Sequence, residues 1–300
     1  MYKEKTIIVD IKGQFGNQAF QYAFARELQK QYGGKIVLNL YNFKKYSPNY
    51  FNMELEKFQL IGNVEISYKK LPFYVDEHFI LTKFFLKYFK KATFKIMSKL
   101  GCLMWNNGRE YIEIPKINSN TIYTLGYWQS EKFFKNSEAI LKKDFLPIDI
   151  RPEIIEIANN LSSKETVCVS IRRGDFMNVK NIKKFFICDK EYFEKCIKIM
   201  KGKIKSPVFV FFSDDVEAVK NEFSDLAENI LYEPSNLQIT EKLYLMSNCK
   251  HFILSNSSFS WWAQYLLTND KKTVLAPNRW FNIGKNQKGS MYMDNWEIVN

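Results

Sequence analysis

The second half of the chain alternates short apolar strands with amphipathic helices, and this alternation restricts the fold more than any other feature. Each predicted strand is a short run of β-branched or aromatic residues, and the helices repeat apolar residues at helical spacing. Strict alternation of this kind predicts a parallel sheet flanked by helices. The predicted strands are Thr166–Ile171, Val208–Phe212, Ile230–Tyr232, His251–Leu254 and Thr273–Ala276. The predicted helices are Tyr192–Met200, Val216–Phe223, Gln238–Ser247 and Phe259–Leu267.

The first half of the chain starts in the same way but becomes irregular. Thr6–Asp10 and Lys35–Leu40 are predicted strands joined by a helix, and Thr121–Leu125 predicts another strand. Residues 41–75 have no regular periodicity and predict loops and short elements. Because 300 residues exceed what one core usually organises, we predict an α/β protein with two Rossmann-like domains facing a cleft. The predicted domains are residues 1–155 and residues 156–300.

The composition is that of a folded and basic protein. Apolar residues make up 46% and charged residues 25%, which excludes a disordered chain. The net charge of +12 favours anionic partners such as nucleotide-sugars, acidic lipids or nucleic acid. The five cysteines are scattered and odd in number, which indicates a reducing compartment. Because the N-terminal segment reads as a strand and not as a signal peptide, we expect a cytoplasmic protein.

Two arginines follow directly after the strand Thr166–Ile171. Arg172 and Arg173 are thereby delivered to its carboxyl end, which is where ligands bind in open α/β sheets. Paired guanidinium groups match the oxygens of phosphate. Gly174 allows a close backbone turn, and Asp175 can pin one arginine so that the other faces a ligand. A surface salt bridge after a strand is the alternative interpretation.

Two strand-to-helix turns are suited to anions. The turn Ile11–Gly16 contains two glycines and can direct backbone N–H groups and the positive end of a helix toward an anion. It lacks the GxGxxG pattern of dinucleotide-binding folds, and a turn that only packs is the alternative. Asn256, Ser257 and Ser258 precede another helix, where N–H groups and hydroxyls can hold a phosphate. Helix capping alone is the alternative there.

Tyr127, Trp128 and Gln129 follow the predicted strand Thr121–Leu125. Aromatic faces beside an amide are suited to stacking on a sugar ring. Packing in the core is the alternative interpretation of these side chains.

Together these stretches resemble a known family. They are Gly13–Leu28 (GQFGNQAFQYAFAREL), Thr166–Phe176 (TVCVSIRRGDF), Phe209–Asp215 (FVFFSDD) and Leu254–Leu266 (LSNSSFSWWAQYL). In this order and at this spacing they resemble the α-1,2-fucosyltransferases of glycosyltransferase family 11, over nearly the whole chain. The resemblance implies the GT-B architecture. It also implies inverting, metal-independent transfer of L-fucose from GDP-β-L-fucose to the 2-hydroxyl of a galactoside in lipopolysaccharide or capsule synthesis.

The resemblance also implies roles for individual residues. Its donor-site contacts are Gly16, Asn17 and Gln18 of the first turn, which could equally touch the acceptor, and Asn256, Ser257 and Ser258 at the diphosphate. Its acceptor-site contacts are Tyr127, Trp128 and Gln129, which could equally line the fucose pocket. The chain departs from the family's pattern at Ser170, where relatives often carry His, and at Gln14, where they often carry a small or basic residue.

The sequence offers no obvious metal site for the departing diphosphate. It contains no Asp-x-Asp triplet, and its two histidines, His78 and His251, are far apart. We therefore predict that Arg172 and Arg173, with helix-terminal amides, neutralise the charge in place of a metal. From the sequence, Arg173→Ala is predicted to lower turnover on the order of a hundredfold.

Carboxylates supply the remaining candidates. Asp214 and Asp215 follow a buried strand, and a carboxylate there can accept hydrogen bonds from the adjacent ring N–H and amino group of guanine. N-capping of the next helix is the alternative. The general base for the acceptor hydroxyl is sought among Asp175, Asp189 and Glu191.

Phe79–Leu100 is predicted to be a basic amphipathic helix or helix pair. Its lysines recur at steps of four among aromatic and aliphatic residues, and no acid interrupts them. The lysines in this register are Lys83, Lys87, Lys91, Lys95 and Lys99. One interpretation is peripheral contact with anionic lipid of the inner leaflet, which would suit a lipid-linked glycan acceptor. A domain helix with a solvated lysine face is the other.

Three rival functions remain open at this point. The first is a transferase of the same fold with another donor or linkage, and the second is an inactive glycan-binding relative. The third is a basic nucleic-acid-binding protein, which would show a steep salt dependence of affinity. That third function leaves the two anion-binding turns unexplained, so no nucleic acid partner is expected.

Overall fold

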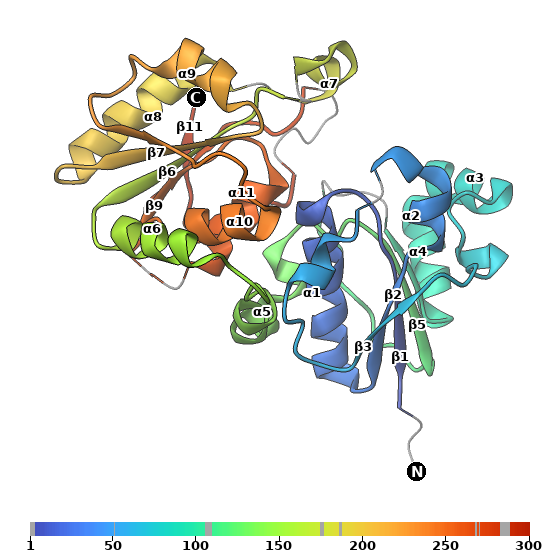
Figure 1. Cartoon of the computed structure of the whole chain (residues 1–300). Helices are drawn as coiled ribbons and strands as arrows, with labels where there is room; N and C mark the ends of the chain where they lie inside the picture. Colours follow the sequence, from blue (N-terminus) through green and yellow to red (C-terminus); the bar gives the residue numbers. More distant parts are fainter. Residues whose placement is uncertain are drawn as a thin grey trace. The chain divides into compact units, whose positions relative to one another are not determined.

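The computed structural model shows two compact units, residues 1–146 and residues 147–300 (Figure 1). The predicted division after residue 155 falls inside helix α6 (Pro152–Ser162) of the second unit. The structure describes residues 4–50, 52–105, 110–174, 177–185, 188–267, 269, 271–282 and 289–300.

The first unit contains a parallel five-stranded sheet in the order β3-β2-β1-β5-β4. Its strands are β1 (Thr6–Asp10), β2 (Lys35–Asn39), β3 (Val64–Ser67), β4 (Cys102–Trp105) and β5 (Thr121–Gly126). Its helices are α1 (Phe15–Tyr32), α2 (Tyr41–Tyr46), α3 (Ile80–Tyr88), α4 (Lys90–Lys99) and α5 (Glu138–Asp144). The region from Phe79 to Leu100 is therefore the helix pair α3 and α4, as predicted.

The second unit contains a parallel six-stranded sheet in the order β11-β10-β9-β6-β7-β8. Its strands are β6 (Thr166–Ile171), β7 (Val208–Ser213), β8 (Ile230–Tyr232), β9 (His251–Ile253), β10 (Val274–Pro277) and β11 (Glu297–Val299). Besides α6, its helices are α7 (Val179–Lys184), α8 (Lys190–Lys203), α9 (Val216–Phe223), α10 (Ile239–Ser247) and α11 (Ser258–Leu266). The predicted α/β class with two parallel-sheet domains is confirmed.

Helices cover both faces of the second sheet. Figure 1 shows α8 and α9 on one face and α6, α10 and α11 on the other. Every residue of β6 is buried, which explains why this strand is mostly apolar and carries no charged residue. Phe193 of α8 and Phe223 of α9 meet in the core above it, with ring centroids 5.4 Å apart.

Each sheet has one topological switch point, where strands that follow one another in the chain are added first on one side of the starting strand and then on its other side. In the second unit the chain runs from β6 outward to β7 and β8, and then crosses to β9 on the other side of β6. In the first unit it runs from β1 to β2 and β3, and β5 later joins the opposite side of β1. Ligands of open α/β sheets bind outside the carboxyl ends of the strands at such switch points. The loops after β6 and β9, and those after β1 and β5, are therefore where ligand contacts are expected.

Candidate active site

Arg173, after β6, points into its own domain. Its Nε and Nη2 donate to the two carboxylate oxygens of Glu222 on α9, at 2.7 and 2.8 Å. Its Nη1 donates to the carbonyls of Cys188 and Arg172, at 3.0 and 3.1 Å, and the guanidinium lies 4.8 Å from the ring centroid of Phe223. With a side chain only 5% exposed, Arg173 is a buried clamp between β6 and α9.

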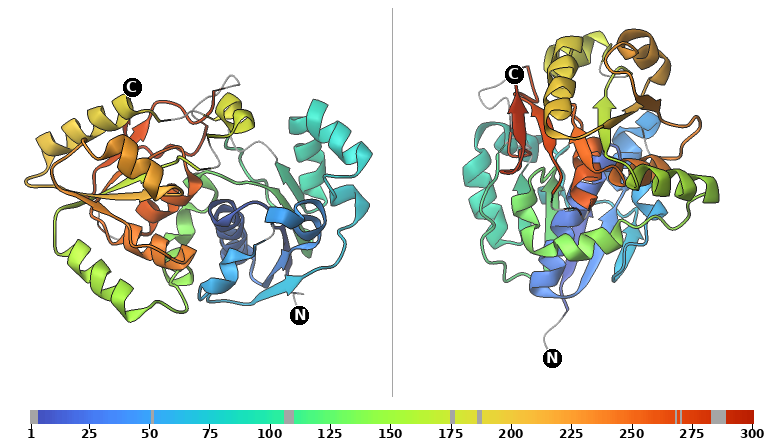
Figure 2. Two further views of the ribbon diagram at one scale, coloured as in Figure 1. Left: turned by 45° about the horizontal axis from the view of Figure 1, so that its top comes forward. Right: turned by 90° about the vertical axis from the view of Figure 1, so that its left-hand side faces the viewer.

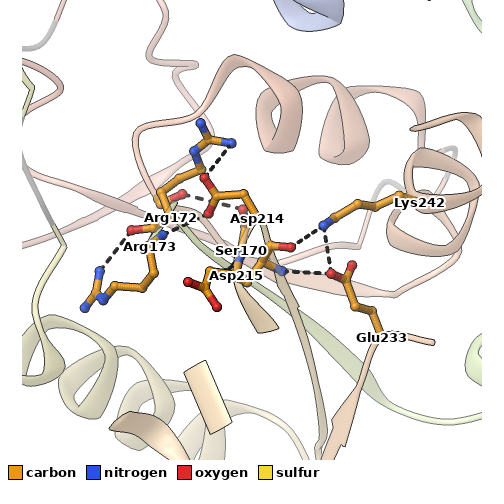
Figure 3. Close-up of polar contacts among 9 residues, drawn as sticks. Ser170, Arg172, Arg173, Asp214, Asp215, Glu233 and Lys242 are labelled. Atoms are coloured by element: carbon orange, nitrogen blue, oxygen red, sulfur yellow. Dashed lines mark hydrogen bonds and ion pairs between the residues drawn. The ribbon is translucent and has the colours of Figure 1, made fainter. Parts of the chain in front are cut away.

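Arg172 occupies a different environment, and Figure 3 shows the two guanidinium groups pointing in different directions. Its side chain is 21% exposed, and its Nη1 lies 3.3 Å from Oδ2 of Asp214. Oδ1 of Asp214 accepts the backbone N–H of Arg173 at 2.9 Å. A Cβ at Gly174 would lie 2.6 Å from Oδ2 of Asp214, so a larger residue there would displace this carboxylate from the turn. Asp214 thus fixes the loop that presents Arg172.

The structure therefore separates two arginines that the sequence treated as a pair. A pinned arginine was predicted, and the carboxylate that pins Arg173 is Glu222. The predicted pinning residue and candidate base, Asp175, lies outside the described residues. Arg172 is the arginine at the sheet edge, whereas the guanidinium of Arg173 is engaged inside the domain. Arg173 is therefore the pinned arginine of the pair, and its predicted part in catalysis stays a prediction.

The turn after β7 is held from two sides. Asp215 N-caps α9, since its Oδ1 accepts the N–H of Ala218 at 3.0 Å, which confirms the capping alternative for this residue. Lys242 of α10 donates to the carbonyl of Ser213 and, at 2.8 Å, to Glu233. Burial raises the pKa of Glu233, which Lys242 opposes. Glu233 and Lys242 were not predicted from the sequence, although Glu233 is an acid directly after a short strand, a position that indicates the carboxyl edge of the sheet.

The loop between β9 and α11 presents polar groups at the same sheet edge. Asn256 is buried, and its Nδ2 donates to the carbonyl of Trp280 at 2.8 Å, whereas its Oδ1 has no hydrogen-bond partner among the described residues. Ser257 is the N-cap residue of α11, but its side chain makes no capping hydrogen bond, and Ser258 is the first helical residue. Capping by the Ser257 hydroxyl, the alternative left open by the sequence, is therefore not observed.

Two serines join the loops across the switch point. Ser170 is buried near the end of β6, and its Oγ lies 3.5 Å from Oγ of Ser255. Because β6 and β9 are neighbours, Arg172 and Ser257 follow two adjacent strands. The structure thus brings the predicted arginine and serine loops to one edge of one sheet.

The first turn of α1 gives a different result for Gln18. Its Nε2 donates to the carbonyls of Gly13 and Asn52, at 2.9 and 2.7 Å, and its Oε1 accepts the N–H of Glu54 at 3.0 Å. Gln18 is therefore a fully buried amide that holds the 52–54 loop, and its contact with the donor or acceptor stays a prediction. Gly16 is buried in the same turn.

Trp128 is also a core residue and not an exposed sugar platform. Its side chain is 1% exposed, stacks on Phe24 with centroids 4.2 Å apart, and meets Phe133 edge-on at 5.2 Å. Its φ of 52° is rare for a bulky residue. Packing in the core, the alternative left open by the sequence, is confirmed for Trp128.

Asn17 and Gln129 meet at the switch point of the first unit. Nε2 of Gln129 donates to Oδ1 of Asn17 at 2.8 Å, which joins the turn after β1 to the turn after β5. The position of Asn17 also explains why residue 13 is glycine. Gly13 has a φ of 78°, and a Cβ added there would lie 2.5 Å from Nδ2 of Asn17. Tyr127 is half-buried beside them. Two separately predicted sets of contacts therefore share one edge of the first sheet.

A buried charged cluster at this edge was missed by the sequence analysis. Asp10 ends β1 with 2% exposure and accepts a hydrogen bond from Asn42 at 3.3 Å. Lys12 pairs with Glu77 at 2.8 Å and lies 5.2 Å from the ring centroid of Tyr127. Burial raises the pKa of Asp10 to about 7, against the opposing effect of Lys12. Its signal in the sequence was an acid at the end of a strand.

Asp10 predicts a specific pH dependence of stability. Because its pKa is raised in the folded state, its stabilising contribution is complete below about pH 4 and is lost as the pH rises to about 7. Asp10→Asn should therefore gain stability relative to the wild type from pH 4 to pH 7, by at most about 4 kcal/mol. Urea denaturation at several pH values measures this difference. A constant difference between wild type and variant would contradict it.

The remaining candidate bases have structural partners. Asp189 N-caps α8 through the N–H of Tyr192 at 2.9 Å, and Glu191 pairs with Lys195 at 2.8 Å with a side chain 71% exposed. Across the described ranges, no group of three or more His, Cys, Asp or Glu side chains is placed to hold a metal ion. The same part of the chain holds no helix with the length and apolar character needed to span a membrane.

Two parallel-sheet units with polar loops at their switch points are the fold of the GT-B class. The solved structure of NodZ alpha-1,6-fucosyltransferase co-crystallized with GDP has this fold. It matches with a TM-score of 0.51 and 16% identity over 88% of this chain and 93% of that chain. The chain belongs to glycosyl transferase family 11, whose family model matches residues 6–300.

Two bacterial relatives cover nearly the whole chain. An alpha-1,2-colitosyltransferase of Escherichia coli is 29% identical over 92% of this chain and 92% of its own length. The O-antigen biosynthesis glycosyltransferase WbnK of Escherichia coli is 26% identical over 95% of this chain and 98% of its own length.

Proposed function

We propose that this family 11 enzyme transfers L-fucose from GDP-β-L-fucose to the 2-hydroxyl of a galactoside in cytoplasmic surface-glycan synthesis. Family membership and the names of the two bacterial relatives support the sugar class, the linkage and the glycan context. The observation that carries the proposal is the partly exposed Arg172 at the switch point of the second unit.

The second unit is the proposed donor site. The guanidinium of Arg172 and the N-terminus of α11 at Ser257 would bind the diphosphate, where negative charge develops as GDP departs. Asp214 and the Glu233–Lys242 pair keep the β7 turn in place around them. In this proposal the cation that metal-dependent transferases recruit is supplied by Arg172, so no metal is required.

The reaction is proposed as a single inverting displacement. The acceptor 2-hydroxyl attacks C1 of fucose from the face opposite GDP, the bond between C1 and the diphosphate oxygen breaks, and the β-linked sugar becomes α-linked. The hydroxyl proton leaves to a carboxylate or to water, and GDP takes the bonding electrons. The first unit, with Tyr127 and the Asn17–Gln129 pair, is the proposed acceptor side.

Release of GDP tests this proposal directly. GDP-fucose is incubated with lactose or N-acetyllactosamine in the presence of EDTA, beside GDP-mannose and UDP-galactose as donor controls. We expect release only with GDP-fucose and a terminal galactose, and no loss of rate with EDTA. Absence of GDP binding would refute the proposed donor site, whereas binding without turnover would refute only the acceptor.

The colitosyltransferase relative favours a second donor. Colitose is L-fucose without its 3-hydroxyl, so the two sugars differ by one hydrogen-bonding group. A site that hydrogen-bonds the 3-hydroxyl rejects the deoxy sugar strongly. Comparing kcat/KM for GDP-fucose and for GDP-colitose decides between them, and a preference for GDP-colitose would assign that donor instead.

A further inference from the structure

Helix α3 exposes the side chains that a domain helix normally buries. Its one buried residue is Thr82, and Leu86 is partly buried against the core of the first unit. Five large apolar residues point to solvent instead. They are Ile80 (77% exposed), Leu81 (58%), Phe84 (49%), Phe85 (47%) and Tyr88 (59%).

The exposed apolar side chains continue into α4. Phe94 and Ser98 of α4 are buried and attach it to the sheet, where Phe94 meets Trp105 of β4 with centroids 5.7 Å apart. Phe89, Ile96 and Leu100 are exposed. Figure 2 shows α3 and α4, in teal, side by side on one flank of the first unit. We call the exposed residues of these two helices, from Ile80 to Leu100, the α3–α4 surface.

The aromatic residues of this surface contact one another. The ring of Phe84 lies 5.7 Å from that of Phe85, 5.1 Å from that of Tyr88 and 6.2 Å from that of Phe89. Phe85 and Phe89 are 6.2 Å apart. The surface is therefore a connected aromatic patch and not a scatter of single apolar residues, which would need no explanation.

The charge around this patch has a single sign. Six lysines and no acidic residue occur between Phe79 and Leu100, and all six are exposed. Lys87 lies over the ring of Tyr88, with its Nζ 4.9 Å from the centroid. The lysines are Lys83, Lys87, Lys90, Lys91, Lys95 and Lys99. An anionic partner with an apolar layer beneath its charges complements such a surface.

We propose that the α3–α4 surface docks on an anionic lipid bilayer and lies in its interface. Aromatic side chains bind at the level of the lipid headgroups, and lysines extend their apolar stems while keeping the ammonium in water. The two helices are too short to span a bilayer. Because α4 packs on β4, binding fixes the whole first unit at the lipid surface, where lipid-linked glycans are held.

Co-sedimentation with lipid vesicles tests the proposal without any turnover. The full chain is mixed with vesicles of phosphatidylglycerol and phosphatidylcholine in equal parts, or with phosphatidylcholine alone. We expect binding to the first and much weaker binding to the second, with loss at high salt. Phe84→Ser/Phe85→Ser should abolish binding, because it removes two rings that the proposal places in the bilayer interface. Both rings are exposed, so their removal leaves the core of the first unit intact.

A charge-matched pair of variants tests the location of the contact. Lys87→Gln/Lys91→Gln should weaken binding about twenty-five-fold, since each lysine near an anionic surface contributes about fivefold. Lys198→Gln/Lys201→Gln removes the same charge from exposed positions of α8 in the second unit and should leave binding within about twofold. GDP release with a soluble acceptor should be unchanged in all these variants.

Several results would overturn the proposal. Equal binding to neutral and anionic vesicles, or equal losses in the Lys87/Lys91 and Lys198/Lys201 variants, would rule out a specific electrostatic contact at the α3–α4 surface. Absence of vesicle binding, together with self-association that Phe84→Ser/Phe85→Ser abolishes, would make the surface a protein interface. None of these results depends on the donor or acceptor being correctly assigned.

Discussion

Arg172→Ala is expected to lower the turnover number for GDP release on the order of a hundredfold, the usual cost of losing one preorganised transition-state donor. Arg172 is the partly exposed arginine at the end of β6, and its guanidinium is held at the sheet edge by Asp214. The sequence analysis attached this effect to Arg173, whose guanidinium the structure places on Glu222. Steady-state kinetics with GDP-fucose and an excess of acceptor measures the change.

Two further variants make the Arg172 prediction specific. Arg172→Lys keeps the charge but loses the planar fork, so we expect intermediate turnover. Lys220→Ala removes one positive charge from α9, where Lys220 pairs with Glu217 at the surface, and should leave turnover unchanged. Arg172→Ala within a few-fold of wild type, with GDP affinity intact, would remove this arginine from the mechanism.

The sheets were predictable where the strands are buried on both faces. Thr166–Ile171 is rich in β-branched and apolar residues and Val208–Phe212 is a continuous apolar run, and the structure has β6 and β7 there within a residue. The polar residues that follow such strands necessarily reach the carboxyl edge. The sequence therefore predicted that Arg172 lies at the carboxyl edge, whereas its position beside the β9 loop depends on the pairing of β6 with β9, which was not predicted.

Some short elements escaped prediction because they carry too few residues to show a period, although the three-residue strands β8 and β9 were predicted from their β-branched and aromatic residues. β4 is four buried residues, and β11 is three residues at the end of the chain. β3 and α2 lie within residues 41–75, which read as irregular. Pairing with a neighbouring strand, and not local propensity, defines such strands.

The contacts of individual side chains could not be predicted where the partner is distant in sequence. Nothing local indicates that Glu222 reaches Arg173 or that Asn52 and Glu54 surround Gln18. From the sequence, Trp128 was a candidate for stacking on a sugar ring because an amide side chain lies next to it. In the structure, Phe24 of α1 stacks on its ring instead. Residue type at a strand end thus predicts location well, whereas it predicts the direction of the side chain poorly.

The ion pair between Arg173 and Glu222 is expected to contribute a second large effect, on stability. Glu222→Ala leaves a guanidinium that is 5% exposed without its carboxylate. Breaking a fully buried pair costs about 3–5 kcal/mol, and because Glu222 is 41% exposed we expect about 2 kcal/mol. Urea denaturation measures the free energy of unfolding. Glu217→Ala, which breaks the exposed pair with Lys220 on the same helix, should cost less than about 0.5 kcal/mol.

The same variant distinguishes positioning from direct contact with the donor. Arg173 donates its backbone N–H to Asp214, which holds Arg172, so a loosened Arg173 should weaken GDP binding through the loop. Glu222→Gln keeps an acceptor for Arg173 and should recover part of both the stability and the GDP affinity. A Glu222→Ala protein as stable as Glu217→Ala would show that the clamp does not hold the loop. A loss of stability with unchanged GDP affinity would instead show that Arg173 only stabilises the core of the second unit and does not position the donor site.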